Sequence, residues 1–221
     1  MTDNRKSGIA LIAGSVGGIV TMAIHPTAGG SLTPAQIDRL AVVSGLAHGI
    51  AIVSVVAMFL GACGLAQGIG AGDRVAFAGI VTFGFACIAI FVAATVSGFM
   101  VPATMKHMVR DAANMHMWQV VIDGIFQINQ AFAQIYSLAA SLAVILWSIS
   151  ALRNGGLGRS LAVYGCIISG LIMVGVGIGH LRLNVHGMAM VWLGQAIWFI
   201  VAGVQLWSAG SRESSPRVAG R

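Results

Sequence analysis

Six long apolar runs set the strongest limit on what this chain can fold into. They cover residues 8–24, 40–66, 75–101, 125–152, 161–179 and 188–207, with short polar segments between them. A helix needs about 20 apolar residues to cross a bilayer. The runs are continuous, whereas the strands of a membrane β-barrel alternate apolar and polar residues. We therefore expect an all-α integral membrane protein, built as a six-helix bundle.

Charge supports this class and argues against a nucleic-acid partner. Charged residues make up 8 % of the 221 residues, against about 25 % in soluble domains. The net charge of +6 comes from basic residues that stand singly between apolar runs, without the basic stripe of nucleic-acid-binding proteins. The expected surroundings are the lipid bilayer, with room for a membrane protein partner or a homo-oligomer.

The basic residues also predict the orientation. With the N-terminus inside, the inner segments carry eight Lys and Arg residues and the outer segments carry four, namely Arg39, Lys106, Arg110 and Arg182. Cytoplasmic loops are the ones enriched in basic residues. We therefore expect a multi-pass protein of the plasma (inner) membrane with both termini in the cytoplasm.

The domain organisation is simple. Residues 1–209 are expected to form one membrane domain, with the first run kept as an uncleaved span, and residues 210–221 a disordered polar tail. Thr33, Pro34 and Gln36 fit a helix start with a capping box. Residues 110–124 predict a helix lying on the outer surface, with a bend at Asp123.

Six histidines fall on the predicted outer face, two in each outer hairpin: His25, His48, His107, His116, His180 and His186. The segments AHGIAIV (residues 47–53) and VHGMAMV (residues 185–191) open two spans in the same way. This similarity suggests a weak repeat of the hairpin of spans 1–2 in the hairpin of spans 5–6.

Imidazole is the commonest metal ligand, so this gathering suggests a transition-metal or haem site. His48 and His186 are the expected core ligands, as a haem-binding pair or as part of a metal site, with His25 and His180 next. Thioether and imidazole together suit copper, and the segment around His107 and His116 also holds Met105, Met108, Met115 and Met117. The alternative is structural: histidine tolerates the headgroup region, and methionine fills apolar gaps.

A polar stripe follows the fourth span. Asp123, Gln127, Gln130, Gln134, Ser137 and Ser141 fall within an arc of roughly 80° on a helix of about 100° per residue. Such residues face partners or water inside a membrane protein. They predict either hydrogen bonds between helices or the polar pathway of a small-solute transporter or channel.

Catalytic signatures do not occur. The sequence has no G-x-S-x-G, HExxH, P-loop or dinucleotide-binding glycine motif, so it favours binding over an enzymatic role without deciding the matter. A structural or accessory membrane subunit is a third possibility. Histidine-mediated binding of a metal or haem is the specific function that the sequence favours.

Overall fold

The computed structural model describes residues 3–26 and 33–213, and within these ranges every regular element is a helix. The elements are α1 (Asp3–Ile24), α2 (Pro34–Gly70), α3 (Arg74–Thr95), the π-helix η1 (Val96–Met100), α4 (Val101–Arg110), the short 3₁₀ helix η2 (Ala112–Asn114), α5 (Met115–Asn154), α6 (Arg159–Gly177) and α7 (Val185–Glu213). Six helical segments of the described residues are long and apolar enough to span a membrane, which confirms the all-helical class and the expected number of spans by length and composition.

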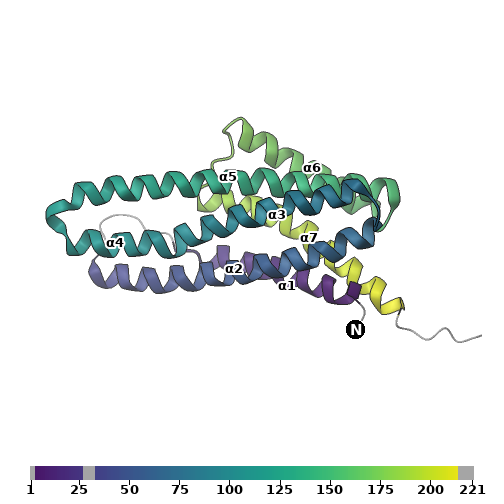
Figure 1. Ribbon diagram of the computed structural model, residues 1–221, viewed down its shortest axis with the longest axis horizontal. Coiled ribbons are helices and arrows are strands. Elements are labelled where there is room, and N and C mark those ends of the chain that lie inside the picture. The colour runs from purple at the N-terminus through teal and green to yellow at the C-terminus, as the bar shows by residue number, and fades with distance from the viewer. Residues whose placement is uncertain (1–2, 27–32, 214–221) are drawn as a thin grey trace, which may run out of the picture.

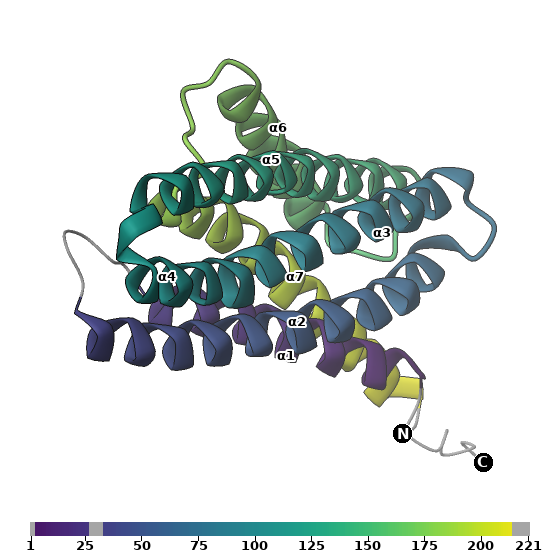
Figure 2. The same cartoon turned by 60° about the vertical axis from the view of Figure 1, so that its left-hand side comes forward.

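The helices run side by side along one long axis (Figure 1). Helix α1 packs between α2 and α7, α3 packs on α5, and α6 covers the other side of α5 (Figure 2). The first turn of α1 and the last turn of α7 lie at the same end of the bundle (Figure 2), which we call the termini end; the opposite one is the far end. This arrangement agrees with the orientation predicted from the basic residues, in which both termini lie on the same side of the membrane. Which side that is stays a prediction.

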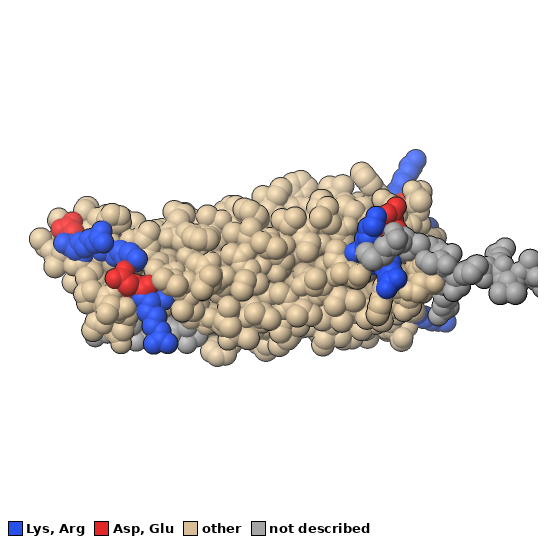
Figure 3. Space-filling view, turned by 90° about the horizontal axis from the view of Figure 1, so that it is seen from below, with Lys and Arg blue, Asp and Glu red and all other residues tan. Residues whose placement is uncertain are grey.

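The surface of the bundle is largely apolar. Large apolar side chains point outward along its length, with Val53 70 %, Phe85 63 % and Leu171 65 % exposed. On the face shown in Figure 3, Lys, Arg, Asp and Glu gather at the two ends and leave the middle uncharged. An apolar belt between two charged ends matches a bilayer core between two headgroup layers.

Three helices reach farther than the others. The segment Arg74–Arg110 has 37 residues, as does α2, and Ala112–Asn154 has 43; 37 helical residues measure about 55 Å against about 30 Å of bilayer core. At the far end, α2, α4 and α5 continue past α1, α6 and α7 (Figures 1 and 2). We call these first turns of α2 and α5, with α4 and η2, the helical extension.

In place of the predicted surface helix, the structure has the helices of the helical extension, which contact one another. Lys106 Nζ lies 2.8 Å from Asp38 Oδ1, joining α4 to α2, and the His107 ring stacks on Trp118 at 5.5 Å, joining α4 to α5. Helix α5 continues unbroken through Asp123. The predicted bend at Asp123 is therefore wrong. Gly124 follows it, but a glycine within a helix costs only about 1 kcal/mol and does not force a break.

Helix ends follow local sequence where the structure describes them. Thr33 caps α2, accepting from the Gln36 amide while the Gln36 side chain accepts from the Thr33 amide, so the predicted capping box is confirmed. Helix α7 continues to Glu213, past the predicted start of the tail at residue 210. The remainder of that prediction, residues 214–221, lies outside the described residues.

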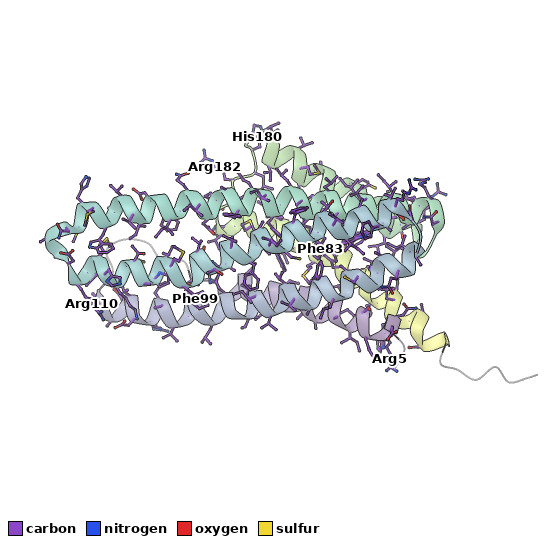
Figure 4. All side chains as sticks on the ribbon, viewed as in Figure 1. Arg5, Phe83, Phe99, Arg110, His180 and Arg182 are labelled. Carbon is purple, nitrogen blue, oxygen red and sulfur yellow. The ribbon has the colours of Figure 1, made fainter. Side chains whose placement is uncertain are left out.

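The half of the bundle toward the termini is filled by aromatic rings. Phe83, Trp147, Trp198 and Phe199, here called the aromatic cluster, lie 5.2–6.2 Å apart in their closest pairs, and each is at most 2 % exposed. Trp147 Nε1 donates to the Ala76 carbonyl at 3.1 Å, tying α5 to α3. Figure 4 labels Phe83, whose ring points into the bundle.

Glycines bring α1 close to its neighbours. Gly14 lies against Met58 and the Ser54 carbonyl of α2, and Gly18 lies against the Trp192 ring of α7, so a side chain at either position would collide. Close approach of this kind drives helix association in lipid. A Cβ at Gly49 of α2 would meet nothing within 4 Å. This glycine therefore does not mediate a close contact between helices.

Candidate functional site

A cavity of about 310 Å³ lies among α1, α2, α3, α5 and α7, in the half of the bundle toward the far end. Its size is at the lower limit of small-molecule sites. Most of the wall is apolar, and its polar residues are Thr21, His25, His48, Ser97, Asn129, Gln130 and Asn184. An apolar cavity with a few convergent polar groups is the usual form of a ligand site.

Two histidines from different helices meet in this wall. The rings of His25, which follows α1, and His48 of α2 lie 4.9 Å apart between centres, at 71° to each other. His48 is 5 % exposed. Its Nδ1 lies 2.8 Å from the Ser44 carbonyl oxygen, and His25 Nδ1 lies 3.1 Å from that of Pro26.

These contacts fix the chemistry of both rings. A carbonyl oxygen only accepts, so in each ring Nδ1 carries the hydrogen and, in the neutral form, Nε2 keeps a free lone pair. Burial lowers the pKa of His25 below its ordinary value, against the opposing effect of the hydrogen bond to Pro26. The His25 ring is therefore neutral at pH 7, and the pair offers two imidazole nitrogens as acceptors or metal ligands.

The π-helix η1 lies directly against His48. Gly98 packs on the His48 side chain so closely that a Cβ at this position would overlap it, and Ser44 Oγ donates to the Ser97 carbonyl at 3.2 Å. Pro102 lacks an amide hydrogen and its ring conflicts with the carbonyl four residues earlier, that of Gly98. Pro102 is therefore the feature of the sequence that accounts for this widened turn, and the sequence predictions did not include it.

Amide side chains complete the polar wall. Gln130 Nε2 donates to the Leu183 carbonyl at 3.2 Å, and Asn184 Oδ1 accepts from the Gly187 amide at 3.0 Å. The Asn129 side chain makes no hydrogen bond to another described residue. Asn129 thus brings an amide donor and acceptor to the same cavity that the two imidazoles line, with no partner among the described residues.

The predicted polar stripe of the fourth span divides into parts with different surroundings. Asp123, Gln127 and Gln134 are exposed, Gln130 lines the cavity, and Ser137 and Ser141 are buried. Asp123 accepts a hydrogen bond from Gln119 of its own helix.

On the side of the cavity toward the termini, the polar residues of the stripe take part in hydrogen bonds between helices. Tyr136 Oη donates to Gln195 Oε1 at 3.2 Å, and Gln195 Nε2 donates to Ser141 Oγ at 3.1 Å. Ser137 Oγ donates to the Ala133 carbonyl of its own helix. The buried part of the stripe thus joins α5 to α7, and beyond it lies the aromatic cluster.

The histidine pair that the structure brings together is not the one that the sequence favoured. His48 meets His25, whereas His186 is exposed and does not line the cavity, and His180 is exposed in the α6–α7 connection (Figure 4). The two His-Gly segments also differ. Gly49 has open space, while Gly187 packs on the Arg182 carbonyl. The suggested repeat of hairpins stays a prediction.

The methionine-rich segment belongs to the helical extension rather than to the cavity. Met105 packs beside Val96, Val101 and Ile125. Met108 is half-buried, and Met115, Met117 and His116 are exposed. The thioethers that line the cavity are instead those of Met22 and Met188. Among the described residues, no group of three or more His, Cys, Asp or Glu side chains gathers in metal-binding geometry.

No protein-family model, curated protein or solved structure matches this chain, so the candidate site stands on its own residues.

Proposed function

We propose that this protein binds a small, uncharged, hydroxyl-bearing molecule in the cavity beside His25 and His48. One observation carries the proposal: two imidazole acceptors and the Asn129 amide, which has no hydrogen-bond partner among the described residues, line one mostly apolar cavity. A hydroxyl group can donate to an imidazole Nε2 and accept from an amide at the same time. The ligand would therefore satisfy polar groups that the chain leaves free.

The absence of charge in the wall defines the ligand further. Among the described residues, no Lys, Arg, Asp or Glu lines the cavity. An ion without a partner charge pays a large desolvation cost in such surroundings. Phosphate, carboxylate and ammonium groups are therefore poor ligands, and a neutral hydroxyl compound is a good one.

Binding is favoured over an open pathway by the residues below the cavity. The Tyr136–Gln195–Ser141 hydrogen bonds occupy the stripe where a solute would have to continue, and the aromatic cluster fills the next layer. A cavity that is closed on the side toward the termini suits a receptor, a sensor or one state of a carrier.

The test uses p-cresol, a neutral ring with one hydroxyl group, and toluene, which has the same ring without it. Binding is measured by titration calorimetry on the protein in lipid nanodiscs. We expect p-cresol to bind at least ten times more tightly than toluene, and Asn129→Leu to abolish that preference. Gln134→Leu is the matched control, because Gln134 lies on the same helix and is exposed outside the cavity. Equal binding of both compounds, or an unchanged preference in Asn129→Leu, would overturn the proposal.

A transition metal ion is the second candidate ligand, and the tied Nδ1 atoms favour it. Histidines that bind metals donate their other ring nitrogen to a carbonyl or carboxylate, as His25 and His48 do to backbone carbonyls. Met22 and Met188 in the same wall add thioether sulfur, which with imidazole suits copper(I).

Elemental analysis of the purified protein tests the metal candidate. It predicts near-stoichiometric copper that is lost in His25→Ala and kept in His186→Ala, the exposed histidine. Protonation of His25 would release the ion, and because burial lowers its pKa from 6.5, release is expected only below pH 6.5. Copper-free protein after expression in copper-supplemented medium would contradict this candidate.

A further inference from the structure

A second hollow runs beside the cavity, on the surface between α2 and α3. This groove has a volume of about 440 Å³ and is lined by Val55, Val56, Phe59 and Leu60 of α2 and by Gly84, Cys87, Ile88, Phe91 and Val92 of α3. None of these nine residues carries an oxygen or nitrogen in its side chain. The groove thus offers nothing to a polar group and a continuous wall to hydrocarbon.

The groove and the cavity adjoin. Val55 lines both, and on α3 the cavity residues Ile90 and Ala93 neighbour the groove residues Phe91 and Val92 in sequence. From His48 to Leu60 the two hollows together cover about 18 Å along α2. One molecule can therefore extend from the polar wall of the cavity into the groove.

The groove faces the bilayer. Val56 is 51 % exposed, and Leu60 and Ile88 are each 62 % exposed, in the part of α2 and α3 that forms the apolar belt. A ligand that enters here comes from the lipid phase rather than from water. It must itself be lipid-soluble, which requires a hydrocarbon part.

We infer that the ligand is an uncharged amphiphile with one hydrocarbon tail, which enters sideways from the bilayer between α2 and α3. Its hydroxyl-bearing head lies in the cavity beside His48 and Asn129, and its tail lies in the α2–α3 groove. The inference rests on the proposed function and adds the tail, the groove and the route of entry.

The test compares 4-decylphenol with p-cresol, which share a phenol head and differ in the tail. Binding is measured in nanodiscs on the natural protein and on Gly84→Leu, in which the new side chain enters the groove. Gly170→Leu is the matched control. It places the same side chain on α6, away from the groove, where a Cβ meets nothing within 4 Å.

We expect Gly84→Leu to weaken 4-decylphenol at least tenfold, to leave p-cresol unchanged, and Gly170→Leu to affect neither. A decylphenol with a diazirine at the end of its tail should label peptides of α2 and α3 around Leu60 and Ile88. Unchanged decylphenol affinity in Gly84→Leu, or labelling confined to other helices, would overturn the inference.

The outcomes separate the two proposals. If Asn129→Leu weakens both phenols while Gly84→Leu weakens neither, the head site stands and the tail inference fails. If Asn129→Leu weakens neither phenol, the proposed function fails. If Gly84→Leu weakens 4-decylphenol but Asn129→Leu does not, the groove holds a tail without the cavity holding the head, and the combined inference fails.

Discussion

The aromatic cluster and the cavity lie among the same helices but differ in the size of the side chains that these helices place there. Around Phe83 and Trp147, four large rings fill the space among α3, α5 and α7. Toward the far end, α3 presents Ala93 and Ala94, η1 presents Ser97, and about 310 Å³ stays open. The comparison teaches that the cavity lies where α3 and η1 carry small residues, while large rings fill the same space closer to the termini.

The largest expected effect concerns two buried tryptophans, one in each region. Trp147→Ala should lower the free energy of unfolding by about 3–5 kcal/mol, because it removes a ring packed on all sides and its hydrogen bond to Ala76. Trp192→Ala should cost clearly less, since the Trp192 ring already borders the cavity. Denaturant unfolding in detergent measures both, and equal losses would break the comparison.

The next effect concerns two alanines seven residues apart on one face of α3. Ala86 is completely buried and belongs to the main core, whereas Ala93 lines the cavity. Ala86→Leu should cost about 1–3 kcal/mol through overpacking. Ala93→Leu should be near neutral for stability and should weaken p-cresol, because its side chain enters the open volume. Thermal unfolding and calorimetry together check this pair, and a strong loss of stability in Ala93→Leu would count against an open cavity.

A smaller effect is expected at Asp73, which caps α3 and accepts hydrogen bonds from Ser150 and Asn154 of α5 at the termini end. The Ser150 hydroxyl first, and then the Val75 amide, hold its pKa below the ordinary 3.8. A lowered carboxyl pKa means that the unfolded chain binds a proton more readily. The stabilisation is thus present above about pH 4 and is lost as the pH falls through the lowered pKa.

Asp73→Asn should therefore lower Tm at pH 7, by less than Trp147→Ala, and the difference from the natural protein should shrink below pH 4. Thermal scans between pH 3 and pH 7 provide the measurement. Asp3→Asn is the control, since Asp3 is at the same end and contacts only its own helix. A difference that grows toward low pH would have the wrong sign for this explanation.

The smallest effect is expected at the opposite end, in the helical extension. Lys106 and Asp38 form an ion pair whose carboxylate side chain is 69 % exposed. Exposed pairs contribute about 0–1 kcal/mol, so Lys106→Met should change stability by less than about 1 kcal/mol and leave p-cresol binding unchanged. A larger loss would show that the helical extension supports the cavity mechanically.

Sequence alone predicted features that depend on neighbouring residues. The six spans follow from apolar runs longer than the bilayer requires, and the capping box at Thr33 needs only residues three positions apart. The gathering of the histidines on one outer face was inferred from the order of the spans, and it stays a prediction. His25 and His48 were among the predicted ligands because each stands at the predicted outer end of a span.

Features that depend on which helices are in contact could not be predicted from the sequence. The sequence favoured His48 with His186 because both precede glycine, yet the structure places α1 beside α2, so that His48 meets His25 instead. The burial of Ser141 against Gln195 likewise depends on α7 packing on α5. Helix order around a bundle is set by the sum of many packing contacts, which no short motif records.

The π-helix η1 lets the helix hold one extra residue without turning α4. A π-turn holds one residue more than an α-turn, so the five residues Val96–Met100 turn the chain about as far as four residues of a regular α-helix do. Deleting one residue from this segment would therefore let α-helix continue and keep Lys106 facing Asp38 and His107 facing Trp118. An insertion or deletion within the regular part of α3 would instead turn every later residue by about 100°. In this helix η1 is thus the place where a change of length by one residue is expected to be tolerated best.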